Sequence, residues 1–192
     1  MHVIIYAHPG TESFNHAVLE RAIAVFQQRN EPYVIVDLYK LNYNPVLSLE
    51  EMNGQSTEDT KLYQALIKNA NSILFIFPVW WFRAPAILEG FIDKVFVPGF
   101  GYRFKKISGT YGYPKPLLHD KKVLAIITHG APALPVRTIY INAVKYRFLL
   151  GFLSFCFNIF KCRIVQLWSV PFISEAKREN YLRKVERKLQ AL

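Results

Sequence analysis

The chain has 192 residues, of which 52% are hydrophobic and 20% charged, a length and composition that fit one globular domain over residues 1–192 and exclude a disordered protein. Its 24 Lys and Arg residues against 14 Asp and Glu residues give a net charge of +10, which favours anionic ligands, nucleic acid or an acidic membrane surface unless it is only a solvated basic face. No nucleic-acid-binding motif accompanies the charge, so we expect no nucleic-acid partner.

The two cysteines, Cys156 and Cys162, match neither a redox pair nor half of a zinc site, so we expect packing roles for both, a reduced cytoplasmic environment and no metal. No basic segment followed by a long apolar stretch opens the sequence, so no signal peptide is expected. The most apolar segment, residues 148–157, is shorter than the roughly 20 residues that span a bilayer. A buried or dimer-facing helix is expected there.

Short runs of β-branched and aromatic residues alternate along the chain with longer stretches of helical period. We expect strands at 3–6, 33–37, 72–77, 123–128 and 163–170, helices at 15–29, 57–69, 85–96, within 137–155 and at 174–189, and a long Gly- and Pro-containing loop at 105–120. Nearly continuous apolarity is typical of strands buried on both faces, and helices between such strands imply right-handed crossovers. The sequence therefore predicts an α/β fold with a doubly wound parallel sheet and helices on both faces.

In such a sheet the ligand lies outside the carboxyl ends of the strands, so the loop after the first expected strand is a candidate site. Residues 7–15, with the sequence AHPGTESFN, precede a helix, whose free backbone amides could bind a phosphate together with His8, Ser13 and Asn15. Ser13 or Asn15 would serve equally well as an ordinary helix cap, and His8 as a structural residue. Because neither GxGxxG nor GKS/T is present, a dinucleotide-binding Rossmann turn and a P-loop are not supported.

The loops after the third and fourth expected strands are also unusual. The third strand is followed by the aromatic sequence Pro78-Val79-Trp80-Trp81-Phe82, which suits a flat ring system, although core packing or a protein interface would explain Trp80 and Trp81 equally well. The fourth strand ends in Thr128-His129-Gly130-Ala131, where small residues let backbone amides approach a ligand or simply make a tight turn.

Together these stretches resemble the flavodoxin-like NAD(P)H:quinone oxidoreductases, a family that includes mammalian quinone reductase and the bacterial ancillary proteins of glutathione-regulated potassium efflux. The resemblance extends over nearly the whole chain and is strongest at 8–17, 37–45, 77–96, 99–104 and 155–156. It implies a flavodoxin-like sheet of five parallel strands in the order 2-1-3-4-5. It also implies a homodimer whose two sites lie at the interface.

The resemblance implies a role for each loop. His8, Ser13, Phe14, Asn15 and Ala17 would surround the phosphates of a flavin, Pro78, Val79, Trp80, Trp81 and Phe82 would lie along its ring system, and Thr128, His129, Gly130 and Ala131 would meet its pyrimidine edge. Tyr102 and Phe104 would reach across the dimer to the partner's substrate pocket, which Trp81 and Phe82 also line. The implied reaction is a ping-pong transfer of two electrons from NAD(P)H through the flavin to a quinone.

The chain departs from the mammalian pattern at the Tyr and His that assist hydride transfer, because those places hold Val136 and Asn142. His129, which replaces a Thr of the family's turn, becomes the candidate catalytic residue, since an imidazolium near pH 7 would stabilise charge on the flavin. The lost pair and the basic C-terminal helix also favour an alternative function. The chain would then be a regulatory flavoprotein that binds a potassium efflux transporter or another membrane partner, with weak or no reductase activity.

A second departure concerns the identity of the flavin. The stretch from Gly54 to Leu62 is shorter than the corresponding stretch of the mammalian enzyme, which contacts the adenine half of FAD. FMN is therefore at least as plausible as FAD. Lys177 falls near a family position that contacts the adenosine end, so FAD stays open.

Overall fold

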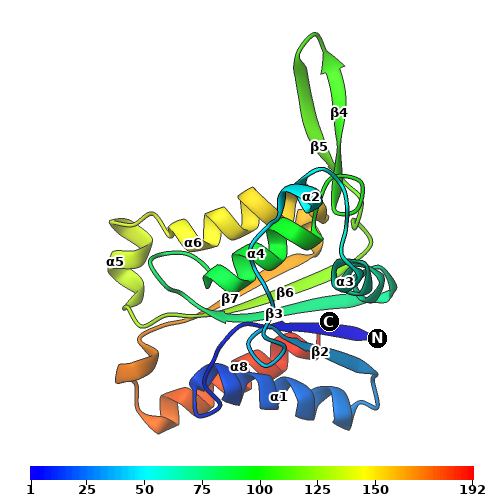
Figure 1. Cartoon of the computed structure of the whole chain (residues 1–192). Coiled ribbons are helices and arrows are strands. Elements are labelled where there is room, and N and C mark those ends of the chain that lie inside the picture. Colours follow the sequence, from blue (N-terminus) through cyan, green and yellow to red (C-terminus); the bar gives the residue numbers. More distant parts are fainter.

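The computed structural model describes residues 1–192 and centres on a twisted sheet of five parallel strands (Figure 1). The strands are β1 (His2–Tyr6), β2 (Tyr33–Asp37), β3 (Ser72–Pro78), β6 (Lys122–Thr128) and β7 (Cys162–Leu167). They lie in the order β2-β1-β3-β6-β7, and every neighbouring pair is parallel. The prediction of a doubly wound five-stranded parallel sheet in the flavodoxin-like order is confirmed.

Helices cover both faces of this sheet (Figure 1). One face carries α1 (Phe14–Gln28) and α8 (Glu175–Leu189), and the other carries α3 (Glu58–Asn69), α4 (Ala86–Val95), α6 (Ala143–Tyr146), the π-helix η1 (Arg147–Leu153) and α7 (Ser154–Cys156). The shorter helices α2 (Leu49–Met52), α5 (Ala133–Thr138), η2 (Ile159–Lys161) and η3 (Val170–Phe172) lie in the connections. No helix has both the length and the apolar character needed to cross a membrane.

The central strands are buried on both sides, which explains their continuous apolar sequences. In β1, Val3 and Ile5 belong to the core beneath α3 and α4, whereas Ile4 and Tyr6 belong to the core beneath α1 and α8. Successive side chains of a strand point to opposite faces, so a strand between two helical layers needs an apolar residue at every position.

Residues 105–120, predicted as a loop, instead form most of an antiparallel hairpin of β4 (Tyr102–Ser108) and β5 (Tyr111–Pro116), which projects away from the sheet (Figure 1). The prediction was wrong because nearly every hairpin side chain is exposed, so no buried face imposes an alternating apolar pattern. The prolines of β5 are tolerated because both strands of a two-stranded ribbon are edge strands.

The helix expected within 137–155 is interrupted. Ile141 and Asn142 both have φ of 48°, a left-handed conformation that ends one helical segment before α6 begins. The cysteine prediction is confirmed in part: Cys156 and Cys162 are buried and unpaired, and burial raises the pKa values of their thiols to about 12 and about 11. Neither thiol is therefore ionised near pH 7.

Gly90, in the middle of α4, lets the backbone at Pro45 pack directly against this helix. A Cβ atom at position 90 would lie 2.2 Å from the Pro45 carbonyl oxygen, much closer than van der Waals contact allows. The segment around Pro45 therefore crosses α4 and is called the strap below. It can pack this closely only because residue 90 has no side chain.

A buried ion pair joins α2 to α4 beside the same strap. Lys94 Nζ lies 3.0 Å from Glu51 Oε1, and each side chain is only 8% exposed. The same ammonium donates to the backbone carbonyls of Asn44 (3.2 Å) and Val46 (3.3 Å). Burial raises the pKa of the Glu51 carboxyl, but a backbone hydrogen bond from Ser48 and the adjacent Lys94 outweigh burial and hold the pKa below its usual value. Lys94 of α4 therefore links this helix to α2 and to the strap.

Candidate functional site

The three loops singled out in the sequence meet at the carboxyl edge of the sheet. The backbone N–H of Val79, after β3, donates to the carbonyl of Thr128, at the end of β6 (2.8 Å). The Thr128 hydroxyl donates to Oδ1 of Asn15 at the start of α1 (3.1 Å). The ring centroids of His8 and Trp80 are 6.5 Å apart. Loops that are far apart in sequence are thus brought together at one edge, as a doubly wound sheet requires of its ligand site.

The first loop folds on itself and leaves backbone donors free. Ser13 donates to the Gly10 carbonyl (2.9 Å) and accepts from the N–H of His16 (3.1 Å). It is therefore the N-cap of α1, the alternative to phosphate binding expected for this residue. His8 accepts from the N–H of Gly10 through Nδ1 (3.0 Å). The N–H groups of Phe14 and Asn15 donate to no protein group, and Ala17 follows them in the first turn.

A buried hydroxyl without a partner lies below this first turn. Tyr6, the last residue of β1, is 2% exposed, and its hydroxyl has no hydrogen-bond partner. Its ring contacts the ring of His16 edge-on at 6.4 Å, and burial raises the pKa of its phenol. Free amides and an unsatisfied polar atom at the N-terminus of a 15-residue helix fit a phosphate group, which accepts hydrogen bonds and is favoured by the helix dipole.

The aromatic loop is a tight turn in a strained conformation. Trp80 and Arg83 exchange two backbone hydrogen bonds (3.0 and 2.9 Å), and the residues between them, Trp81 and Phe82, have φ of 50° and 58°. Aromatic residues rarely adopt positive φ, and such strain of about 1–3 kcal/mol per residue concentrates at functional sites. Trp81 is 89% exposed, which excludes core packing for it, whereas Phe82 stacks on Tyr140 at 4.2 Å.

A cleft of about 550 Å³, called the aromatic cleft below, opens beside this turn. Its walls include the aromatic side chains of the turn, the strap around Pro45, and the charged residues Arg83, Glu89, Asp93 and Arg147. Arg147 donates to both carboxylate oxygens of Glu89 at 2.9 Å, and burial raises the pKa of that carboxyl. Neither Glu89 nor Arg147 was predicted from the sequence. A carboxylate in the first turn of the helix after the aromatic loop could have indicated Glu89.

A larger cleft, of about 760 Å³, lies between α2, α3 and α4. It is lined by the Glu51–Lys94 pair and by other residues that include none of those predicted for the site. Of the two clefts, only the aromatic cleft is adjacent to the converging loops.

The loop after β6 presents two free backbone donors. The N–H of His129 donates to the carbonyl of Leu167 (2.7 Å), and the carbonyl of His129 accepts from the N–H of Val170 (2.9 Å). By contrast, the N–H groups of Gly130 and Ala131 have no protein acceptor, and both residues are exposed. Two unpaired donors at this edge fit the expected flavin, because its pyrimidine edge carries acceptor oxygens and gains negative charge on reduction.

His129 itself does not behave as predicted. Its ring is 2% exposed and stacks on Trp168 with centroids 4.0 Å apart. Burial lowers the pKa of His129 to about 4, so the imidazole is neutral at pH 7 and the expected imidazolium is wrong. The reason is that the ring is enclosed by Trp168 and by Gln166, whose amide donates to His129 Nε2 (3.0 Å), and a charge there would lose its hydration.

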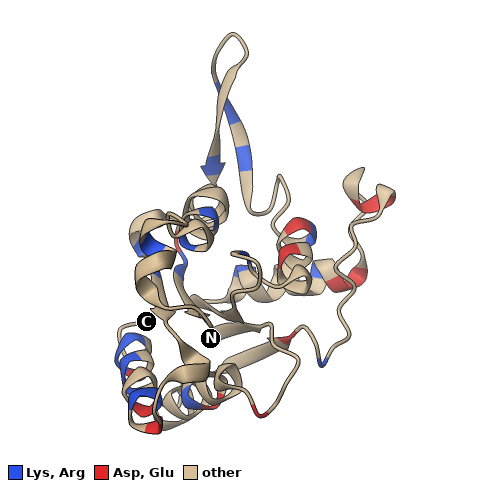
Figure 2. Ribbon diagram, turned by 90° about the vertical axis from the view of Figure 1, so that its left-hand side faces the viewer, with Lys and Arg blue, Asp and Glu red and all other residues tan.

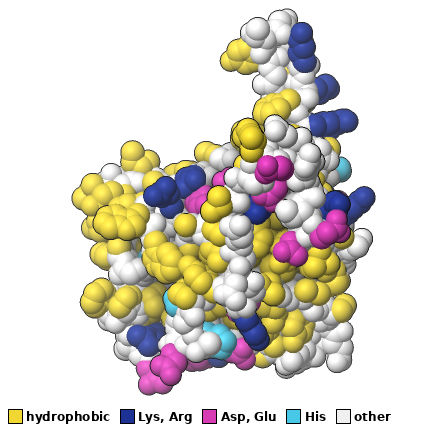
Figure 3. Space-filling model, in the orientation of Figure 1, with side chains coloured by type: hydrophobic (Ala, Val, Ile, Leu, Met, Phe, Trp, Pro, Cys, Tyr) yellow, Lys and Arg dark blue, Asp and Glu magenta, His cyan; other side chains and the backbone are white.

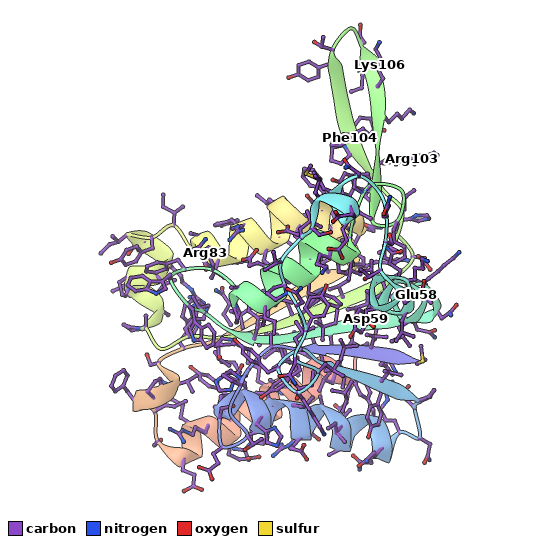
Figure 4. The ribbon with its side chains drawn as sticks, in the orientation of Figure 1. Glu58, Asp59, Arg83, Arg103, Phe104 and Lys106 are labelled. Carbon is purple, nitrogen blue, oxygen red and sulfur yellow. The ribbon has the colours of Figure 1, made fainter.

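Tyr102 and Phe104 both belong to β4 of the hairpin, and Figure 4 shows Phe104 well apart from Arg83 of the aromatic turn. Tyr102 is half-buried against Phe155 at 5.7 Å, while Phe104 is 65% exposed. Val136 and Asn142, which occupy the places of the mammalian Tyr and His, are both buried. Neither supplies a titratable group to the site.

Comparison with known proteins agrees with this architecture. A family model described as "Flavodoxin-like fold" matches residues 1–191. A protein of Haemophilus influenzae named "Uncharacterized NAD(P)H oxidoreductase" is 36% identical over 135 residues, which make up 68% of this chain and 64% of that protein. NAD(P)H dehydrogenase [quinone] 1 of Rattus norvegicus is 27% identical over 85% of this chain and 67% of its own length. The solved NAD(P)H:quinone oxidoreductase of Methanothermobacter marburgensis has a TM-score of 0.77 at 25% identity and covers 98% of this chain and 95% of its own.

Proposed function

Because the chain belongs to the family of proteins with the flavodoxin-like fold, we propose that residues 1–192 form one domain, a flavin-dependent NAD(P)H:quinone oxidoreductase. One observation carries this proposal: free amides at the start of α1, an exposed aromatic turn and free amides after β6 converge at one edge of the sheet. The names of the relatives from rat, Haemophilus and Methanothermobacter support it. None of these names refers to a transporter, so the transporter alternative is without support from them.

Each converging loop has a distinct task in this function. The N–H groups of Phe14 and Asn15, with His8 nearby, would bind the phosphate. The turn around Trp81 would place flat reactants face to face, and the backbone amides of Gly130 and Ala131 would stabilise negative charge without a titrating side chain. A bound FMN or FAD supplies the ability to take a hydride from NAD(P)H and to pass two electrons to a quinone. The charge is thus stabilised by fixed dipoles and not by His129.

Anaerobic titration tests the proposed reaction. We expect purified protein loaded with FMN or FAD to lose its visible flavin absorbance when NADH or NADPH is added, and to regain it when a quinone follows. The quinone alone should change nothing, which makes it the control. Absence of bleaching with both nucleotides, in protein that retains its flavin, contradicts the oxidoreductase assignment.

We also propose that the protein works as a homodimer in the cytoplasm, where its thiols stay reduced. The hairpin supports a second copy as the partner: Phe104 and Tyr111 are 65% and 76% exposed on a two-stranded ribbon, a unit that is marginally stable alone. Figure 3 shows Lys and Arg side chains gathered along one side of this projecting ribbon. They form no ion pair within the chain, and Arg103 lies directly opposite Lys115, a repulsive arrangement. Figures 2 and 4 show acidic residues on other elements, including Glu58 and Asp59 of α3, that a second copy would present.

Sedimentation equilibrium of the flavin-loaded protein tests the dimer. We expect the mass of two chains at low ionic strength, and a shift toward one chain for a Phe104→Asp variant, because a charge would replace an apolar contact. Phe160→Asp is the matched control, because Phe160 is also an exposed aromatic residue (83%) but lies on η2, outside the hairpin and α3, and this variant should leave the mass unchanged. A single-chain mass for the unmodified protein refutes the proposal.

A further inference from the structure

A polar cluster of the buried His129 and Asn142 and the half-buried Gln166 adjoins the turn that presents the Gly130 and Ala131 amides. Asn142 donates through Nδ2 to Oε1 of Gln166 (3.0 Å), and Gln166 donates through Nε2 to Oδ1 of Asn142 (2.8 Å). The same Gln166 Nε2 donates to Nε2 of His129 (3.0 Å). The cluster therefore joins β7, the connection between α5 and α6, and the end of β6.

The turn is anchored on both of its sides, and the cluster supplies the side-chain anchor on the His129 side. His129 is fixed through its ring by Gln166 and by the stacked Trp168, and through its backbone by Leu167 and Val170. On the far side of Gly130, the Ala131 carbonyl accepts from the N–H of Ser169 (3.1 Å). The only unpaired donors between these anchors are the N–H groups of Gly130 and Ala131, and they face solvent.

Two further features show that this arrangement is imposed by tertiary structure. Asn142 is held at φ 48° beside Ile141 at the same φ, a strained pair that persists only when the surroundings fix it. The Arg137 side chain lies 5.2 Å from the centre of the Trp168 ring on which His129 stacks, so a residue of α5 is tied to the same cluster. Neither feature contributes an apolar contact to the main core.

We propose that Gln166 and Asn142 are positioning residues for the oxidoreductase reaction: acting through the neutral ring of His129, they fix the Gly130 and Ala131 N–H groups in the direction that stabilises negative charge on the pyrimidine edge of the flavin. This inference rests on the proposed function. A neutral histidine suits the task because it accepts the Gln166 hydrogen bond and requires no counterion in the interior. The turn is then preorganised before any ligand binds.

The test compares Gln166→Leu with Gln64→Leu, a matched control because Gln64 is also half-buried and its amide makes one hydrogen bond, to the carbonyl of Val95. In flavin-free protein, we expect the backbone amide resonances of Gly130 and Ala131 to move in Gln166→Leu and to stay in place in Gln64→Leu. With FMN bound, we expect Gln166→Leu to lower the preference for reduced over oxidised flavin roughly three- to tenfold. A tenfold loss makes the two-electron potential about 30 mV more negative.

Unchanged Gly130 and Ala131 resonances, or an unchanged potential in a folded Gln166→Leu protein, overturns the inference. If that variant does not fold, Asn142→Gly replaces it, because glycine keeps the left-handed backbone without strain while removing the amide, and the same shifts are expected. Failure of the unmodified protein to bind FMN or FAD refutes the proposed function instead, and the resonances of the flavin-free protein then decide the positioning role by themselves.

Discussion

A Lys94→Met variant is expected to lose about 3–5 kcal/mol of unfolding free energy, the usual effect of removing one member of a buried ion pair. The variant leaves the carboxylate of Glu51 uncompensated in a site where it is 8% exposed. It also removes the donor for the Asn44 and Val46 carbonyls, which fasten the strap to α4. Urea unfolding at pH 7, followed by circular dichroism, measures the change.

A second substitution distinguishes an uncompensated charge from a lost apolar contact. In the double variant Lys94→Met/Glu51→Gln, the residue at 51 is neutral and can still accept from the N–H of Ser48, as Glu51 does at 3.0 Å. The double variant should therefore be more stable than Lys94→Met alone. If the single variant loses less than about 1 kcal/mol, the pair behaves like an exposed salt bridge and the account is wrong.

Acidification from pH 6.5 to pH 4 is expected to remove about 3 kcal/mol of stability through His129 alone. The pKa of this imidazole is about 4 in the folded chain, against a reference value of 6.5. As the pH falls, the unfolded chain takes up the proton first, so the stabilisation is complete above pH 6.5, declines between pH 6.5 and 4, and declines no further below pH 4. Burial lowers the pKa of His2 as well, which adds loss of the same sign.

Denaturant unfolding at intervals between pH 7 and pH 4 measures this dependence. In His129→Gln, the amide can still bond to Gln166 but cannot titrate, so the acid-dependent loss should shrink by most of the 3 kcal/mol given above. Gln64→Leu is the control, because Gln64 is half-buried and carries no titratable group, and it should leave the pH dependence unchanged. Equal pH profiles for His129→Gln and the unmodified protein rule out a buried neutral imidazole.

The parts of the fold that sequence predicts are those in which local pattern and burial agree. β3 is buried at all seven positions, so its continuous apolar run was sufficient to place it. The edge at which the ligand loops meet followed from the alternation of strands and helices, because parallel strands all end on the same side. Residues such as Ser13 and Thr128 could therefore be grouped before their contacts were known.

The parts that sequence misplaces depend on contacts between distant residues. The charged form expected of His129 was wrong because its surroundings come from Gln166 and Trp168, and only the folded chain shows that the ring is buried. The hairpin was missed because its strands pair with each other and cover no core. The Glu51–Lys94 pair joins a four-residue helix to the far end of α4, and no local pattern marks such a partnership.

Gly90 relates the interior packing of α4 to the size of the aromatic cleft. The strap that it admits carries Val46, and Pro45, Val46, Gly90 and Trp81 all line the same 550 Å³ space. A methyl group at position 90 would force this strap outward, because the atoms it would meet belong to the backbone and the rigid ring of Pro45. The absence of one carbon atom at residue 90 thus sets the distance between Val46 and the indole of Trp81. A substitution inside α4 could therefore change which molecules fit between Val46 and Trp81 without changing either residue.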